Sequence, residues 1–352
     1  MSSVASQARV HRAARLEDAL HGLRLRAGRR LGMKPMIVPF VGYGSPDWVR
    51  VLCRVHLTGR RGDRKRQSGN ARGWRSFVAI TIGDEPVTIT AGTKTIVINA
   101  DRGGVIDTRV DVKLSPGWQK ISLSVSGADP VTASVFIVDP RVNFGIVSDV
   151  DDTVMVTAIP RPFLAGWNTF VLNEHARSPV TGMAVLYERL ANAHPGSPIV
   201  YISTGAWNVA PTLSRFLSRN LYPPGPLLLT DWGPTHDRWF RSGRQHKRQS
   251  LEQLAVEFPG IRWLLIGDDG QRDEEIYGEF AAKHPRNVAG IAIRRLSPGE
   301  AVLAGGRSKA GSTKRSRGAL KPIDWMYAPN GSGLADLLVE NGILPPRSNA
   351  VV

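Results

Sequence analysis

Cysteine is almost absent from this sequence: Cys53 is the only one among 352 residues. A single thiol excludes an internal disulfide framework and fits a reducing compartment. The sequence also lacks any run of about 18 apolar residues, so no segment is expected to span a membrane as a helix. Residues 1–34 are rich in arginine but have no apolar stretch typical of a secretory signal. We therefore expect a cytoplasmic protein, which can still associate peripherally with a membrane.

Acidic residues are fewer than basic residues. The chain has 30 Asp and Glu residues and 46 Lys and Arg residues, which gives a formal net charge of +16. Such an excess favours polyanionic partners: nucleic acid, an anionic membrane surface or phosphorylated substrates. Charge alone does not choose among them. Hydrophobic residues make up 42% of the chain, which is enough for two domains with apolar cores.

Residues 1–34 are predicted to hold one basic amphipathic helix. Leu16, Leu20 and Leu23 recur at helical spacing among the arginines of residues 8–31. Either this helix packs on its own domain or it lies on a membrane surface. A second basic stretch, residues 60–66, is interpreted as a solvated loop, with anion docking as the alternative.

From Met36 to Asp139 apolar and polar residues alternate, which is typical of strands with one buried face. The alternation is clearest in residues 49–57, 106–112, 121–125 and 131–137, with Gly, Pro and Asp between the runs. About seven short strands without a helical pattern predict an all-β, immunoglobulin-like sandwich domain over residues 35–140.

After Pro140 apolar strands alternate with helical patterns as far as Leu296. Strands are expected near residues 144–148, 198–203, 227–229, 263–266 and 288–293. This alternation predicts a parallel sheet with helices on both faces, as in a Rossmann-like α/β domain, over residues 141–298. Residues 299–352 are predicted to form a basic linker at 305–319 and a final helix at about 333–340.

Three carboxylates follow the first strand of the predicted α/β domain in the sequence. Asp149, Asp151 and Asp152 lie within four positions and repel one another, so we expect a cation to neutralise them. Oxygen ligands of this kind suit Mg²⁺. In open α/β sheets ligands bind at the carboxyl ends of the strands. The stretch therefore predicts a Mg²⁺ site with one carboxylate free to act as a nucleophile.

Two further features follow in the chain. Ser203-Thr204-Gly205 ends the second predicted strand, and its hydroxyl and backbone N–H groups can hold a phosphoryl oxygen. Lys247 is predicted to open a helix, where its ammonium group can neutralise charge on a transferred phosphoryl group. Both are phosphate-binding features.

Two more strand ends carry charge. The fourth predicted strand ends in Gly267-Asp268-Asp269, whose acids would complete the metal shell, and the last ends in Arg294-Arg295. Each feature alone has an ordinary explanation as a turn, a helix cap or a solvated charge. Together they place acids, a hydroxyl and a lysine in order on several strand ends. Convergent groups of that kind are what a catalytic site requires.

The order Asp149-x-Asp151-x-Thr153, Ser203, Lys247 and Gly267-Asp268-x₄-Asp273 resembles the four motifs of the haloacid dehalogenase (HAD) superfamily of phosphotransferases. More narrowly, residues 144–296 resemble the phosphatidate phosphatases related to the fungal actin patch protein. Two departures flank the phosphate pocket. Asp269 stands where the fungal members usually have Ser, and Thr204-Gly205-Ala206 replaces a stretch richer in Asn and Ser.

The resemblance implies a Mg²⁺-dependent phosphatase that works in two steps. Asp149 would be the nucleophile that forms an aspartyl-phosphate, Asp151 the general acid and base, and Lys247 the third catalytic residue. The implied substrate-binding residues are Thr153, which would also fix the loop, Ser203, Thr204 and Gly205. The implied Mg²⁺ ligands are Asp149, Asp151, Asp268 and Asp269. Asp273 is implied to orient Lys247 or a metal-bound water from behind them.

The substrate is predicted from what surrounds the site. About 45 residues separate Thr153 from the second strand, too few for a large cap domain, so the site would accept bulky or interfacial substrates. Aromatic residues between cations at 232–244 suit the headgroup boundary of an anionic bilayer, although they can equally cover the sheet. The favoured reaction is hydrolysis of phosphatidate to diacylglycerol at an anionic membrane surface.

Two other functions stay open. One is a HAD phosphatase for a soluble sugar, nucleotide or protein phosphate. The other is a basic, non-catalytic protein that binds a membrane or nucleic acid. The full set of aspartates argues against the second, because they would repel a phosphate backbone. The sequence has no aromatic RNA-binding signature, so no specific nucleic-acid partner is expected.

Overall fold

The computed structural model describes residues 21–59, 80–156, 178–230, 243–270, 272–303 and 323–346. Four predicted features lie wholly or partly outside these ranges: residues 8–20 of the basic helix, the charged loop 60–66, residues 232–242 of the aromatic stretch and the linker 305–319. The described chain forms two compact units. The first unit holds the residues up to Ile137, with Gly205–Pro211 and the ends of Leu229–Gly243, and the second unit holds the rest.

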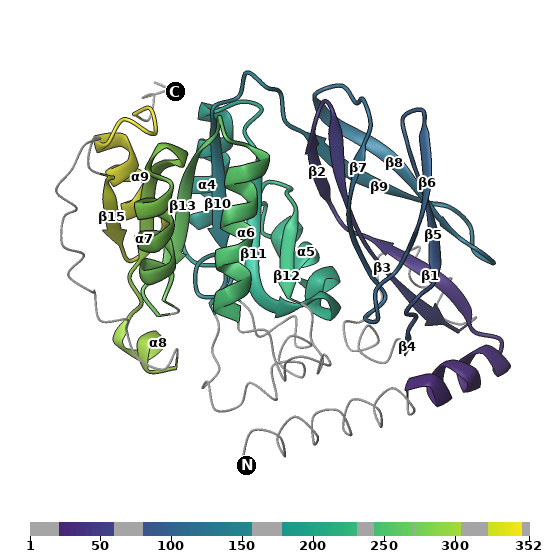
Figure 1. The fold of residues 1–352 in the computed structure, drawn as a ribbon. Helices are drawn as coiled ribbons and strands as arrows, with labels where there is room; N and C mark the ends of the chain where they lie inside the picture. The colour runs from purple at the N-terminus through teal and green to yellow at the C-terminus, as the bar shows by residue number, and fades with distance from the viewer. Residues whose placement is uncertain are drawn as a thin grey trace, which may run out of the picture. The chain divides into compact units, whose positions relative to one another are not determined.

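The strands of the first unit belong to one sheet (Figure 1). Among the described residues it has nine strands in the order β1-β3-β2-β9-β8-β5-β6, with β4 and β7 paired to β3. Their bounds are β1 Lys34–Pro39, β2 Gly42–Ser45, β3 Trp48–Thr58, β4 Ile80–Thr81, β5 Pro86–Ala91, β6 Lys94–Asn99, β7 Val105–Asp111, β8 Gly117–Val125 and β9 Val131–Ile137. Paired strands run antiparallel, except that β2 and β9 run parallel.

Alternate residues of these strands enclose an apolar core. On β3 the inward residues are Val49, Val51, Cys53, Val55 and Leu57, all buried. The alternating runs predicted from the sequence are strands here, because one face of each is buried against this core.

Strand β2 was not predicted, and its glycines explain why. A Cβ atom on Gly42 would lie 2.4 Å from the carbonyl oxygen of Arg50, and one on Gly44 would lie 2.2 Å from that of Trp48. The strand is therefore made by close backbone approach to β3 rather than by alternating apolar side chains.

Residues 21–30 are helical, as predicted for the end of the basic segment. Gly28 is buried, and Leu25 and Met33 pack against the apolar core of the first unit. The arginines of this helix are exposed. Its described part therefore packs on its own unit with a basic outer surface.

The second unit is built on a six-stranded sheet in the order β12-β11-β10-β13-β14-β15. Its strands are β10 Phe144–Asp149, β11 Ile199–Ala206, β12 Leu227–Thr230, β13 Arg262–Asp268, β14 Val288–Arg294 and β15 Trp325–Ala328. Strand β10 pairs in parallel with β11 on one side and β13 on the other, and β13, β14 and β15 are also parallel. The chain leaves β10 in one direction and later returns to its other side, which is where open α/β sheets bind ligands.

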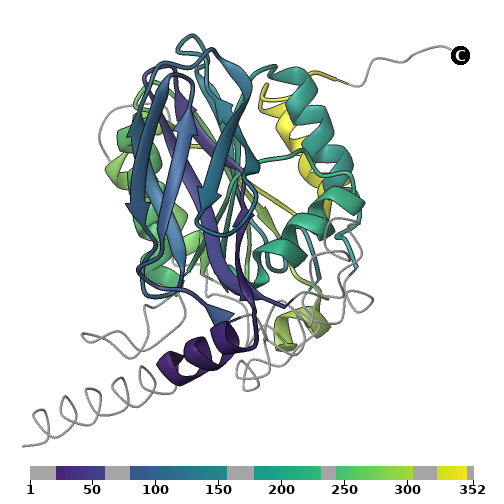
Figure 2. The same ribbon diagram turned by 90° about the vertical axis from the view of Figure 1, so that its right-hand side faces the viewer.

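Helices cover both faces of this sheet, as predicted. The helices are α4 Met183–Ala193, α5 Ala210–Arg219, α6 Gly243–Glu257, α7 Asp273–Lys283, α8 Pro298–Leu303 and α9 Gly331–Glu340. In both views α6 and α7 lie on one face of the sheet and α4 and α9 on the other (Figures 1 and 2).

Several elements differ from the sequence prediction, and short helix α8 is one that was not predicted. Strand β11 continues three residues past Ser203, and α6 begins at Gly243, before Lys247. Edge strand β15 was not expected, because four residues are too few for a recognisable alternation. In the described residues no helix has the length and apolar character needed to cross a membrane.

Candidate active site

The end of β10 and the turn after it carry the first group of polar residues. Asp149, the last residue of β10, is fully buried, and so is Thr153, whose hydroxyl donates to Asp149 Oδ2 over 3.4 Å. Asp152 has a left-handed backbone (φ 57°), which bends the chain sharply between Asp151 and Thr153. Backbone N–H groups of Val154 and Met155 close the turn. The turn therefore places Asp151 and Thr153, two of the predicted site residues, close behind Asp149 in the chain.

Lys247 reaches this group from α6. Its ammonium nitrogen lies 2.6 Å from Asp149 Oδ1 and 2.5 Å from Asp273 Oδ1, and all three side chains are almost completely buried. Asp273 opens α7, where an acidic side chain suits the positive end of the helix dipole. The contact that was predicted between Asp273 and Lys247 is thus present.

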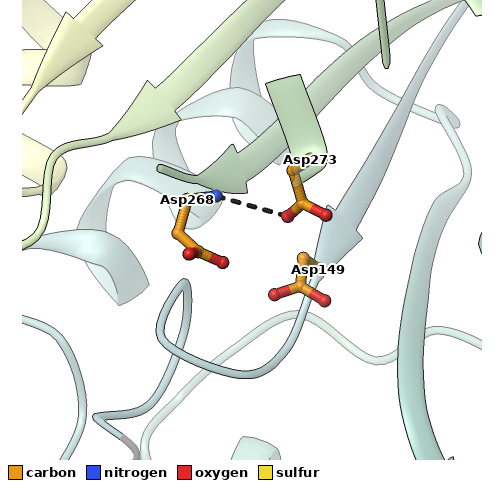
Figure 3. A group of neighbouring side chains, drawn as sticks. All are labelled: Asp149, Asp268 and Asp273. Carbon is orange, nitrogen blue, oxygen red and sulfur yellow. Dashed lines mark hydrogen bonds between the residues drawn. The ribbon is translucent and has the colours of Figure 1, made fainter. Parts of the chain in front are cut away.

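Asp268, the last residue of β13, completes the group (Figure 3). Its backbone N–H donates to Asp273 Oδ2 over 3.3 Å. Gly267 makes this approach possible, since a Cβ atom there would lie 2.4 Å from Asp273 Oδ2. The glycine before the acid is required for space and not for a positive φ.

Burial and charge shift the ionisation of these groups. Burial raises the pKa of Asp149 well above its ordinary value; Lys247 opposes the rise, and Asp273 and Asp151 add to it. Burial, Asp273 and Asp149 raise the pKa of Asp268 in the same way. Burial alone would lower the pKa of Lys247, but the three surrounding carboxylates outweigh it and raise the value. The lysine stays charged, and three ionised carboxylates around this one ammonium group would leave an excess of negative charge.

This excess fits a bound cation. One oxygen from each of Asp149, Asp268 and Asp273 can be chosen so that all three lie within 4.8 Å of one another. Carboxylate oxygens are the donors that a hard divalent ion such as Mg²⁺ prefers. The buried aspartates therefore form a site that could hold a metal ion.

The other predicted residues take different positions. Ser203 is buried on β11 and donates to Asp151 Oδ2 over 2.9 Å. Asp269 uses Oδ1 to accept from the backbone N–H of Leu296 over 2.9 Å, and it is not among the three clustered carboxylates. Thr204 and Gly205 lie within β11, and the Gly205 carbonyl accepts from Thr230. The binding roles of all four stay predictions.

Two residues, Ser148 and Arg294, make contacts at the site that were not predicted. Ser148 donates to the carbonyl of Asp149 over 2.6 Å and also bonds the hydroxyl of Tyr187 on α4. Arg294, noted in the sequence only as a cation at a strand end, donates to the carbonyl of Asp152. The one sequence signal for the Ser148 contacts is a serine directly before the acidic motif. The contact of Arg294 with Asp152 has no signal in the neighbouring sequence.

Comparison with known proteins bears on the second unit. Residues 144–295 match the family described as phosphatidate phosphatase APP1, catalytic domain. The protein named phosphatidate phosphatase APP1 of Saccharomyces cerevisiae is 25% identical over 173 residues, 48% of this chain and 29% of its own length. The uncharacterized protein C29B5.04c of Schizosaccharomyces pombe is 28% identical over 156 residues, 44% of this chain and 25% of its own.

The matches are partial. The chain spans less than a third of the length of these two relatives. Among solved structures, XAC1771, a carbohydrate acetylesterase from Xanthomonas citri, is similar over 73% of this chain and 68% of its own at 10% identity, with a TM-score of 0.28 that is too low to bear on the fold. The resemblance predicted from the motifs is confirmed for one segment: residues 144–295 match the catalytic-domain family of phosphatidate phosphatase APP1.

Proposed function

We propose that this chain is a Mg²⁺-dependent phosphatase that hydrolyses a phosphomonoester, with phosphatidate as the substrate and diacylglycerol as the product. The observation that carries the proposal is the meeting of Asp149, Lys247, Asp268 and Asp273 at the carboxyl ends of β10 and β13. The family match and the name of the yeast relative support the reaction and the lipid substrate. We also propose a HAD-type Rossmann-like fold for the second unit and an immunoglobulin-like sandwich for the first.

In the first step an oxygen of Asp149 attacks phosphorus, a P–O bond to the carboxylate forms and the P–O bond to the lipid alcohol breaks. Asp151 gives its proton to the leaving oxygen. Ser203 holds the carboxyl group of Asp151, and Thr153 holds that of Asp149. The product of this step is an aspartyl-phosphate.

In the second step water attacks the phosphorus, Asp151 takes its proton, and the bond to Asp149 breaks to release phosphate. Lys247 offsets charge on the phosphoryl oxygens, and Asp273 keeps the ammonium group in place. A bound Mg²⁺, held by Asp149 and Asp268 with Asp273 close by, would supply Lewis-acid polarisation of the phosphoryl group.

Action at a membrane surface is supported by the described part of the basic helix. Its exposed cations are Arg24, Arg26, Arg29 and Arg30. Leu23 and Leu31 beside them are 57% and 82% exposed. Exposed leucines among arginines suit the headgroup region of an anionic bilayer.

The test is phosphate release from phosphatidate in mixed micelles, with and without Mg²⁺. We expect Asp149→Asn to lower kcat by at least about 10⁴-fold, as loss of a nucleophile does. Asp336→Asn, on the exposed face of α9, is the matched control and should behave like the parent.

Other results would redirect the proposal. Turnover of p-nitrophenyl phosphate that depends on Asp149, without release from phosphatidate, would favour a soluble substrate. No turnover of either substrate would leave the non-catalytic binding protein as the function to pursue.

A further inference from the structure

Arg294, the last residue of β14, is a buried cation that the proposed reaction does not use. The residue is 5% exposed, and its guanidinium group donates to three separate parts of the chain. Nη1 lies 2.7 Å from the carbonyl oxygen of Asp152, Nη2 lies 2.6 Å from Glu300 Oε1, and Nε lies 3.3 Å from the carbonyl oxygen of Pro329. A planar group with fixed donors is well suited to hold several acceptors at set positions.

The first of these acceptors lies in the turn after β10. Asp152 adopts its left-handed conformation between Asp151, the proposed general acid and base, and Thr153, whose hydroxyl donates to the proposed nucleophile Asp149. Strained positions of this kind persist only where the surroundings hold them. The bond from Arg294 reaches the turn from 142 residues further along the chain, and it fixes the carbonyl group between two functional side chains.

The second acceptor is itself held in place. Glu300 Oε2 accepts from the backbone N–H of Ser297, and the Ser297 hydroxyl accepts from the N–H of Glu300, so the two residues form a capping box at the start of α8. Burial works to raise the pKa of Glu300, but the bonds from Arg294 and Ser297 outweigh it and lower the value. Glu300 is therefore a fixed, ionised counter-charge for Arg294.

We propose that Arg294, held by Glu300, is a positioning residue that sets the conformation of the turn 150–154 for catalysis. This inference rests on the proposed phosphatase function. Loss of the guanidinium group would release the Asp152 carbonyl and allow the turn to relax, which moves Asp151 and Thr153 relative to Asp149. Misplacement of reacting groups by about 1 Å can cost about 100-fold in rate.

The experiment compares four proteins: the parent, Arg294→Met, Arg294→Lys and Arg50→Met. Arg50 is the matched control, because its side chain is 12% exposed against 7% for Arg294 and it also pairs with a carboxylate, that of Asp107 in the first unit. Initial rates on p-nitrophenyl phosphate give kcat and KM, and hydrogen–deuterium exchange reports the amides of residues 150–156.

We expect Arg294→Met to lower kcat by about 10- to 100-fold with KM within about twofold of the parent. Exchange at residues 150–156 should become faster. Arg294→Lys, which keeps the charge and can reach one acceptor, should recover part of kcat, and Arg50→Met should change neither quantity. If Arg294→Met does not fold, Glu300→Gln should show the same pattern with a smaller effect.

Two results would overturn the inference: unchanged exchange at residues 150–156 in Arg294→Met, or a fall in kcat that Arg50→Met reproduces. A parent protein without phosphatase activity contradicts the proposed function instead. The exchange measurement still decides in that case whether Arg294 holds the turn.

Discussion

The two units bury different kinds of side chain. In the described part of the first unit the buried polar residues are His56, Thr58 and Thr230, and its principal ion pair, Arg50 with Asp107, lies at the partly exposed surface of the sheet. Among its described residues, the second unit buries six aspartates, one lysine and one arginine. Burial of charge is unfavourable unless it is paired, and six carboxylates exceed two cations. The first unit buries mostly apolar side chains, whereas the second accepts an unfavourable group of buried charges at the carboxyl ends of β10 and β13.

An Asp→Asn substitution should therefore change the melting temperature in opposite directions in the two units. Asp268→Asn removes a buried carboxylate but keeps an oxygen for the N–H of Gly270, which lies 2.6 Å from Oδ1. We expect about a 10³-fold loss of kcat, since metal assistance is worth several kcal/mol. The melting temperature in EDTA should rise, and added Mg²⁺ should stabilise the parent but not this variant.

Asp107→Asn in the first unit is the counterpart. It weakens the paired hydrogen bonds from Arg50, 2.5 and 2.6 Å long, so the melting temperature should fall while kcat stays unchanged. Thermal unfolding with and without Mg²⁺ measures both variants. A fall in the melting temperature of metal-free Asp268→Asn would contradict the comparison.

Gly267 and Gly44, one in each unit, lie too close to neighbouring atoms to carry a side chain and test the comparison between the units further. Gly267→Ala forces the Asp273 carboxylate away from Asp268 N and from Lys247, so we expect kcat to fall by about 10- to 100-fold. Gly44→Ala in the first unit would place its Cβ atom 2.2 Å from the Trp48 carbonyl oxygen on β3, against 2.4 Å from Asp273 Oδ2 for Gly267→Ala. This control should have a lower melting temperature, measured by circular dichroism. Its kcat, measured by initial rates below that temperature, should be unchanged. Equal losses of kcat would mean that Gly267 acts through stability alone.

A smaller effect is expected at the basic helix of the first unit. The double variant Leu23→Ser and Leu31→Ser should bind vesicles of anionic phospholipid at least about tenfold more weakly, because each buried leucine contributes roughly 1.5–3 kcal/mol. Turnover of p-nitrophenyl phosphate should not change. Co-sedimentation with anionic and with neutral vesicles measures the difference. Equal sedimentation of parent and double variant would argue against this surface as the membrane contact.

The smallest effect concerns Cys53 in the core of the first unit. Burial raises the pKa of its thiol from 9.0 to about 12. The unfolded chain therefore loses the thiol proton at lower pH than the folded chain, so this contribution to stability is complete below pH 9 and declines as pH rises toward 12. Urea unfolding of the parent should show a steeper loss of stability above pH 9 than that of Cys53→Ala. Parallel pH profiles would contradict the assignment.

Much of the fold could be predicted, for a physical reason. Strands such as β3 alternate because one face is buried against a single core, and α6 and α7 are separated by an apolar strand in the usual α/β manner. Among the elements that were missed are β2, which depends on glycine contacts with a neighbouring backbone, and β15, which has only four residues. Neither property produces a periodic pattern of apolar residues in the sequence.

The sequence could predict which residues gather at the site but not which contacts they make there. Strand ends placed Asp149 and Asp268 together, since parallel strands end at one edge of the sheet. The sequence could not tell that Asp269, next in line, would turn its carboxylate to the N–H of Leu296. Nor could it show that Arg294 reaches Asp152, because that contact joins two segments 142 residues apart.

Strand β15 has a consequence for the order of synthesis. The carbonyl groups of Ala328 and Pro329 accept from Arg295 and Arg294, so residues 325–329 complete the edge of a sheet whose centre is made much earlier. A nascent chain that has emerged only as far as α8 presents β14 as an open edge, which invites pairing with other chains. This edge of the sheet can therefore close only after residues 325–329 have been made.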